Sequence, residues 1–238
     1  MTRRVVVYPD AATVATAAAA RLLTVLADTL AVQERADVIL TGGTVGIQAL
    51  REVNASPLRD TVEWTAVHVW WGDERFVASG DSDRNEGQAQ EALLGHLPLP
   101  KENIHRMGNS DEFATAEDAA TAYLGEIEHA GTPAWDVAMF GMGPDGHVAS
   151  LFPGHPVFVE GSADVSAVHD SPKPPPTRVT LSVEVINRAK QVWVVAAGDE
   201  KAGAVAKALA GDTATPASAV HGAETTLWLI DAAAAAQA

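Results

Sequence analysis

Residues 141–153 read GMGPDGHVASLFP and place a carboxylate, Asp145, two positions before an imidazole, His147, in a glycine-rich loop. The apolar run at residues 137–140 comes directly before this loop and predicts a buried strand. His147 is the only side chain in the loop that gains or loses a proton near neutral pH. Asp145 either orients His147 or holds the loop through backbone N–H groups. The pattern predicts a proton-handling site at the carboxyl end of a strand, where open α/β sheets place their chemistry.

A second candidate site is the sequence TGGT at Thr41, Gly42, Gly43 and Thr44, between a predicted strand and a predicted helix. Free backbone N–H groups and the positive end of the helix dipole make such a turn an anion site, to which the threonine hydroxyls add donors. The alternative is a plain strand–helix turn capped by Thr44. The turn lacks the lysine of a P-loop and the glycine spacing of a dinucleotide fingerprint. A mononucleotide or a sugar phosphate therefore fits it better than ATP or NAD.

A third candidate is Arg75, which follows Asp73 and Glu74 after a predicted strand that ends in two tryptophans. Its planar guanidinium binds a carboxylate or a phosphate bidentately and stays charged at all working pH values. An Asp–Arg pair in a solvated turn would have the same sequence, so this motif alone leaves both interpretations open.

Further basic residues surround a proline-rich loop and begin a helix. Lys173 and Arg178 flank the prolines, and Lys201 falls in the first turn of a predicted helix. The helix dipole disfavours a cation there, so either a bound anion or a surface salt bridge is expected to compensate. Ser150 is not part of a GxSxG sequence, so no nucleophile elbow is predicted. The eight histidines are scattered without a second ligand pair, so no metal site is predicted.

Strand and helix patterns alternate along the chain, which predicts a Rossmann-like α/β fold: a largely parallel sheet between two layers of helices. Asp10 is the expected N-cap of a first helix that ends near residue 35, and Asp83 with Glu86 predicts a capped helix that reaches residue 94. The C-terminal half adds a small strand-rich part around the proline loop. With no linker or repeat, residues 1–238 are expected to form one domain. Strands are predicted at residues 5–8, 37–40, 66–71, 136–140, 165–169, 178–181, 191–197 and 226–230, further helices at 44–53, 114–129 and 198–210, and a loop at 72–77.

The composition is that of an acidic globular protein: 47% of the residues are apolar, 20% are charged, and the formal net charge is -15. Such a surface repels nucleic acid and anionic membranes, so neither is expected as a partner. The absence of cysteine excludes disulfides, thiolate nucleophiles and cysteine-ligated metals. No signal-peptide pattern is present, and the alanine-rich stretch at residues 11–20 is too short and too weakly apolar to span a bilayer. A cytoplasmic location is expected.

Together these sites resemble the 6-phosphogluconolactonase family, which shares a fold with glucosamine-6-phosphate deaminases and ribose-5-phosphate isomerases. The matching segments follow the family's order and span most of the chain, and the set is specific although each segment alone is weak. They read TGGT from Thr41, GDERFV from Gly72, SDRN from Ser82, GMGPDGHVASLFPG from Gly141, KPPPTRVTL from Lys173 and GDEKA from Gly198.

The deaminases are the nearest alternative. They resemble this chain at GxGxDGH but carry a glutamate five residues after the histidine, where this chain has Phe152. They also have an aromatic residue where this chain has Arg75. Both differences favour the lactonase over a deaminase-like aldose–ketose isomerase. A non-catalytic sugar-phosphate sensor is a further alternative, because transcription regulators use related folds, but no DNA-binding appendage is recognisable.

The resemblance implies hydrolysis of 6-phospho-D-glucono-1,5-lactone to 6-phosphogluconate, the second step of the oxidative pentose phosphate pathway, without a metal or organic cofactor. In this hypothesis neutral His147 takes a proton from the attacking water, and Asp145 fixes its orientation or the loop. Arg75 would stabilise the oxyanion together with backbone N–H groups of the turn, or be shared between the carbonyl and the phosphate. The expected partner is the small lactone alone, bound by a monomer or weak homodimer. The turn that provides these N–H groups consists of Gly141, Met142 and Gly143. The phosphate and the hydroxyls of the substrate are assigned to Thr41, Gly42, Gly43, Thr44, Asp73, Arg178 and Lys201.

Overall fold

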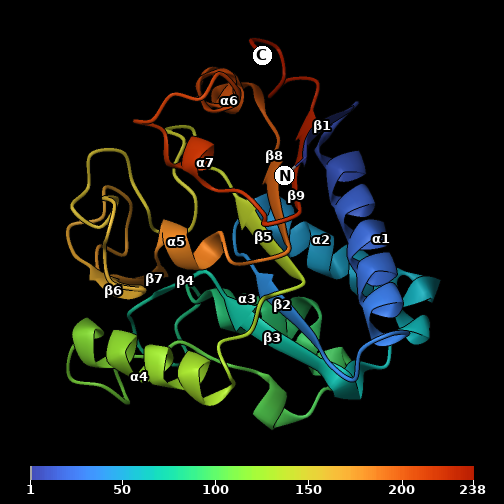
Figure 1. Cartoon of the computed structure of the whole chain (residues 1–238), viewed down its shortest axis with the longest axis vertical. Coiled ribbons are helices and arrows are strands. Elements are labelled where there is room, and N and C mark those ends of the chain that lie inside the picture. The colour runs from blue at the N-terminus through green and yellow to red at the C-terminus, as the bar shows by residue number, and fades with distance from the viewer. Residues whose placement is uncertain (1) are drawn as a thin grey trace.

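A six-stranded parallel sheet forms the centre of the protein (Figure 1). The structure is a computed structural model and describes residues 2–238. The strand order of the sheet is β1-β9-β8-β5-β2-β3, and every neighbouring pair is parallel. Strands β8, β5, β2 and β3 contain apolar runs that are visible in the sequence. Such runs are expected because both faces of a parallel sheet are covered. The strands are β1 (Thr2–Tyr8), β2 (Ala36–Leu40), β3 (Val67–Trp71), β5 (Val137–Gly141), β8 (Gln191–Ala196) and β9 (Thr225–Asp231).

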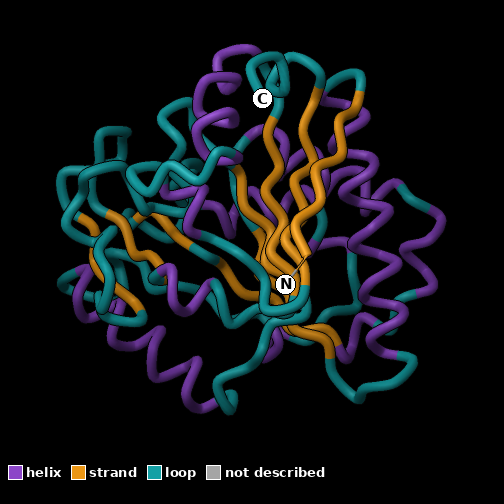
Figure 2. The backbone as a smooth tube through the Cα atoms, turned by 45° about the horizontal axis from the view of Figure 1, so that its top comes forward, coloured by secondary structure: helices purple, strands orange, loops and turns teal. Residues whose placement is uncertain are grey.

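Helices pack on both faces of this sheet, so the predicted three-layer α/β architecture is confirmed (Figure 2). Alternate residues of β2 belong to opposite layers, with Ile39 in one apolar cluster and Val38 and Leu40 in the other. One layer contains α1 (Ala11–Leu30), α2 (Thr44–Ala55) and α3 (Asn85–Ala92); the other contains α4 (Ala116–His129), α5 (Val183–Ile186), α6 (Ala202–Leu209) and α7 (Pro216–Ala219). Short 3-10 segments connect them at Pro57–Thr61, Trp64–Ala66, Leu94–His96, Lys101–Asn103 and Asp199–Lys201.

A second, three-stranded antiparallel sheet has the order β4-β7-β6, with β4 (Asp73–Arg75), β6 (Val165–Val168) and β7 (Arg178–Leu181). The expected strand-rich part is therefore present, but it also recruits a strand from the first half of the chain. The prediction of a loop over residues 72–77 was wrong for β4. Three consecutive charged residues give no apolar alternation, and β4 forms only because it pairs with β7, far along the sequence.

Helix starts show where local sequence rules hold and where they fail. Asp10 is the N-cap of α1, since its carboxylate accepts the Thr13 N–H at 2.8 Å. Asp83, in contrast, does not cap α3: that helix begins at Asn85, and the carboxylate of Glu74 accepts its first N–H groups. A tertiary partner has replaced the local cap. Lys201 ends a 3-10 turn before α6 and does not lie in the helix's first turn as predicted.

Helix α1 is longer than the alanine-rich stretch considered from sequence. By length and composition alone this 20-residue helix could cross a membrane, whereas the stretch considered from sequence, residues 11–20, forms only its first half. In the structure, Leu22, Leu23 and Leu26 of α1 are buried in the apolar cluster beneath it. A helix that covers a sheet needs such an apolar face.

The end of β3 depends on a single buried hydroxyl, which gives a test of the fold. Tyr123 of α4 donates from its Oη to the Trp71 carbonyl at 3.1 Å and accepts the Trp71 N–H at 3.0 Å. Tyr123→Phe leaves both backbone groups unpaired in the interior and is expected to lower the free energy of unfolding by about 1–3 kcal/mol. Urea denaturation measures this loss.

Tyr8→Phe is the matched control. The Tyr8 hydroxyl accepts only long hydrogen bonds from Arg21, at 3.3 and 3.4 Å, near the surface. We expect this variant to lose less than about 0.5 kcal/mol, the usual range for surface changes. Equal losses in the two variants would contradict the assigned role of Tyr123.

Candidate active site

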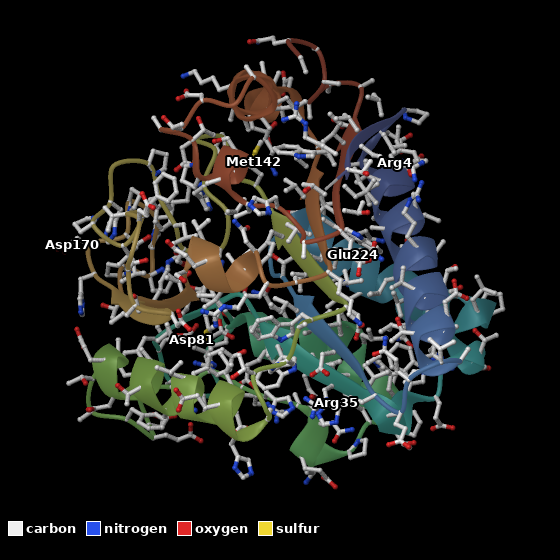
Figure 3. The ribbon with its side chains drawn as sticks, in the orientation of Figure 1. Arg4, Arg35, Asp81, Met142, Asp170 and Glu224 are labelled. Atoms are coloured by element: carbon white, nitrogen blue, oxygen red, sulfur yellow. The ribbon has the colours of Figure 1, made fainter. Side chains whose placement is uncertain are left out.

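The carboxyl ends of β2, β5 and β8 open into a cavity of about 300 Å³, and β4 and β7 form its side. Met142, labelled in Figure 3, marks the end of β5 at this cavity. The structure brings together every residue proposed from sequence except Asp145, which lies behind His147 and faces a neighbouring pocket. The cavity wall contains Thr41, Gly42, Gly43, Thr44, Asp73, Arg75, Gly141, Met142, Gly143, His147, Arg178 and Lys201.

The loop after β5 fixes the orientation of His147. Gly146 adopts a positive φ of 84°, and hydrogen bonds from Gly146 N to the Gly143 carbonyl (2.9 Å) and from Gly143 N to the His147 carbonyl (3.0 Å) close a tight turn. His147 Nδ1 lies 2.5 Å from Asp145 Oδ1, and the His147 ring packs on Phe152 at 4.6 Å between centroids. Both alternatives raised for Asp145 therefore hold, since its carboxylate contacts the ring and also the His147 N–H at 3.3 Å.

The charge of Asp145 decides which nitrogen of His147 is basic. Burial by itself would raise the pKa of Asp145, but the hydrogen bond from His147 and the nearby Lys173 ammonium outweigh it and lower the pKa to about 2. An ionised carboxylate only accepts hydrogen bonds, so Nδ1 of a neutral His147 carries the proton. Nε2 then holds the free lone pair, which is the form that a general base requires.

The opposite wall of the cavity is suited to an anion. Gly43, with a φ of 78°, is the N-cap of α2 and provides no side-chain acceptor for the first-turn N–H groups. The alternative of a turn capped by Thr44 was wrong, because Thr44 is already helical. Residues 44–46 line the cavity, so the N-terminus of a 12-residue helix faces it. Thr41 Oγ1 accepts the Gly141 N–H at 3.2 Å and ties this turn to the loop after β5.

The proposed oxyanion donors are only partly free. Gly141 N–H and Gly143 N–H already donate within the protein, to Thr41 Oγ1 and to the His147 carbonyl. The expectation that these two groups would bind an oxyanion is therefore not supported by the geometry. Arg75 keeps guanidinium donors for a ligand, since the contact of Nη1 with Asn85 is its side-chain hydrogen bond within residues 2–238; its Nε also lacks a partner there but is buried.

Arg178 and Lys201 occupy different environments in the cavity. Arg178 is almost fully buried and donates to the carbonyls of Lys173, Pro174 and Pro175 at 2.9–3.2 Å, so it shapes the proline-rich loop. Burial lowers the pKa of Lys201; the Glu200 charge acts in the opposite direction, and the Lys173 charge adds to the lowering. A nearby anion would restore that pKa, as expected for a lysine in an anion site.

Four polar residues at the site were not singled out for these roles from sequence. Ser150 is fully buried and its Oγ donates to Asp73 Oδ2 at 2.6 Å, so it orients Asp73. Lys173 lines the cavity with its Nζ 3.5 Å from His147 Nδ1. Glu74 and Asn85 are buried beside Arg75. Burial raises the pKa of Glu74 to about 7, whereas Arg84 and three backbone N–H donors lower it. No local sequence pattern predicts these contacts, because they join segments that are separate in the chain.

No group of three or more His, Asp or Glu side chains within residues 2–238 is arranged to hold a metal ion.

A parallel sheet with a base and an anion-binding helix terminus at its carboxyl edge defines an α/β protein that binds a phosphorylated small molecule. The family model for glucosamine-6-phosphate isomerases and 6-phosphogluconolactonases matches residues 9–228. The chain belongs to this family.

Relatives and solved structures agree with this assignment. A protein named 6-phosphogluconolactonase from Streptomyces coelicolor is 46% identical, over 99% of this chain and 95% of its own length. The crystal structure of a 6-phosphogluconolactonase from Thermotoga maritima superimposes with a TM-score of 0.85 at 26% identity, over 97% of this chain and 100% of that one. A monomeric glucosamine-6-phosphate deaminase has a TM-score of 0.82 at 19% identity, covering 100% of both chains, which shows a shared fold alone.

Two glycines of the loop after β5 provide a test of the His147 geometry. A Cβ at Gly143 would overlap the His147 ring, whereas a Cβ at Gly141 would meet nothing closer than the Gly42 carbonyl at 3.8 Å. Gly143→Ala is expected to displace the imidazole from Asp145 and change the ring nitrogen chemical shifts of His147. Gly141→Ala is the control and should leave them unchanged. Unaltered His147 shifts in a folded Gly143→Ala protein would contradict this geometry.

Proposed function

We propose that this chain hydrolyses 6-phospho-D-glucono-1,5-lactone to 6-phospho-D-gluconate, the second step of the oxidative pentose phosphate pathway. Its full-length relatives are named 6-phosphogluconolactonase. The observation that carries the proposal is the His147–Asp145 pair, which presents one basic nitrogen beside an anion-binding helix terminus. The deaminase alternative is disfavoured at Phe152, a buried ring that packs on His147 where a deaminase would need its second titratable group.

In the proposed reaction, His147 acts as a general base. Nε2 takes a proton from water while the water oxygen attacks the lactone carbonyl, and the carbonyl electron pair moves to oxygen. When this pair returns, the bond between the carbonyl carbon and the ring oxygen breaks. The imidazolium then gives its proton to the departing ring oxygen. Asp145 stays ionised throughout and stabilises the imidazolium that forms between the two steps.

Arg75 is the group assigned to the oxyanion, since its side chain lines the cavity and its guanidinium donates to Asn85 alone among residues 2–238. The phosphate is assigned to the turn of Thr41, Gly42, Gly43 and Thr44 at the N-terminus of α2, together with Lys201. Arg178 contributes positive charge and holds the proline loop. Asp73, fixed by Ser150, is placed to accept a hydrogen bond from a sugar hydroxyl.

We further propose that residues 1–238 act as one lactonase domain in the cytoplasm, as a monomer or weak homodimer. No metal, organic cofactor, nucleic acid or membrane takes part in this scheme. A non-catalytic sugar-phosphate sensor is the alternative from another class, and a lactone assay above the spontaneous hydrolysis rate separates the two. Release of ammonia from glucosamine 6-phosphate would identify a deaminase instead of a lactonase.

The base assignment is tested by His147→Ala. Loss of general-base assistance is expected to reduce kcat by about 10²–10⁴-fold. The affinity for 6-phosphogluconate should change little, because the anion-binding wall remains intact. Stopped-flow lactone assays and calorimetric titration of the product measure the two quantities. Near-normal turnover would overturn the assignment.

The phosphate assignment is tested by Lys201→Met. Loss of one charged hydrogen bond is expected to raise the KM for the phosphorylated lactone about 10- to 100-fold. Hydrolysis of unphosphorylated D-glucono-1,5-lactone should be unaffected, since it lacks the phosphate. Lys207→Met on α6 is the matched control, because Lys207 lies in the neighbouring pocket and outside the active-site cavity. Equal effects on both lactones would argue against phosphate binding by Lys201.

A further inference from the structure

Arg75 must be held in place if it is to meet an oxyanion, and the structure holds it without a counter-ion. No ion pair within residues 2–238 involves Arg75. A free arginine side chain carries about 2 kcal/mol of rotamer entropy, so an unheld guanidinium would rarely occupy one catalytic geometry. The protein therefore needs a partner that orients this cation and leaves its charge available to a ligand.

The partner is the side-chain amide of Asn85, the first residue of α3. Its Oδ1 accepts a hydrogen bond from Arg75 Nη1, and its Nδ2 donates to the Asp73 carbonyl at 2.8 Å. The second contact fixes the direction of the amide, because Nδ2 must face a carbonyl and Oδ1 must face the guanidinium. Asn85 is only 2% exposed, so the amide has no room to turn.

Glu74 fixes the position of Asn85 in turn. The Glu74 carboxylate is 1% exposed and accepts three backbone N–H groups, those of Arg75 (2.8 Å), Asn85 (2.8 Å) and Glu86 (2.9 Å). It thereby joins β4 to the N-terminus of α3. Buried Arg84 supports the same junction, since its Nη1 donates to the Arg75 carbonyl at 3.1 Å. The negative charge of Glu74 is thus shared among backbone donors and Arg84.

Gly42 confines the amide from the other side. A Cβ at this position would overlap Oδ1 of Asn85, so only glycine allows the turn at the start of α2 to pass so close. Gly42, the Asn85 amide and the Arg75 guanidinium are consequently in contact with one another at the cavity wall.

We infer that Asn85, held by Glu74, is the positioning residue that aims the Arg75 guanidinium at the reacting carbonyl. This inference rests on the lactonase function proposed above. A neutral amide suits the task because it accepts a hydrogen bond without cancelling the positive charge of Arg75. A carboxylate at the same place would pair with Arg75 and compete with the anionic substrate.

The central experiment is a double-mutant cycle between Asn85 and Arg75. Asn85→Ala is expected to lower kcat about 10²-fold with a smaller change in KM, because misplacement by about 1 Å costs that much. In the Arg75→Ala background, Asn85→Ala should have no further effect on kcat, since it acts only through the guanidinium. If the kcat of the double variant falls by the product of the two single-variant losses, the inference is overturned.

Two more variants distinguish positioning from packing. Asn85→Asp keeps the shape of the side chain but neutralises Arg75, so it should fail to restore kcat; a packing role predicts that Asp restores it. Asn103→Ala is the matched control, because Asn103 is also a buried asparagine that donates to a backbone carbonyl, Thr65 O at 3.0 Å, outside the cavity. It should leave kcat unchanged.

A measurement on the unmutated protein covers the case in which Asn85→Ala does not fold. The side-chain N–H signals of Arg75 in nitrogen–proton NMR should show hindered rotation and slow exchange, unlike those of Arg51, which has an exposed side chain. Freely rotating Arg75 signals would overturn the inference. This readout does not use the lactone, so it remains valid if the protein proves inactive as a lactonase, and inactivity alone would refute only the proposed function.

Discussion

Two arginines stand directly opposite each other in the β4–β7 ladder, and the active site depends on how the protein accommodates them. Arg75 and Arg178 are register partners in an antiparallel pair, where like charges repel. Burial lowers the pKa of Arg178; Asp73 opposes this, and the Arg75 charge adds to the lowering. The protein compensates with carbonyls of the proline loop around Arg178 and with the Asn85 amide at Arg75. An anionic substrate, as proposed above, would complete the compensation of these two charges.

The remainder of the site separates proton transfer from anion binding. The base lies on the loop after β5, where Asp145 directs one nitrogen of His147 away from the cavity and leaves the other for water. The groups proposed to bind the anion come from the start of α2 and from Lys201, on other elements. The four cations that line the cavity, Arg75, Lys173, Arg178 and Lys201, contrast with the net charge of -15 over the whole chain. An anionic substrate is therefore repelled by most of the surface and attracted by the cavity.

The sequence predicted those parts of the fold that local chemistry determines. Buried strands such as β2 and β8 contain apolar runs, at residues 38–40 and 192–196, and the N-cap of α1 is a local contact between Asp10 and Thr13. Strand β4 was missed because its charged residues become a strand only through pairing with β7. The start of α3 was misplaced because its capping carboxylate comes from Glu74, eleven positions before Asn85 in the chain. Residues of this kind act through contacts between distant segments, which a single sequence does not reveal.

The position of β9 has a consequence for how the protein is made. Strand β9, close to the C-terminus, lies between β8 and β1, so the first strand of the chain has no partner in the sheet until the last strand has been synthesised. The pairing of β1 with β9 thus joins segments that are far apart in the sequence, and contacts of this kind form slowly during folding. The sheet is therefore complete only when a segment more than 200 residues further along the chain has come to lie beside β1.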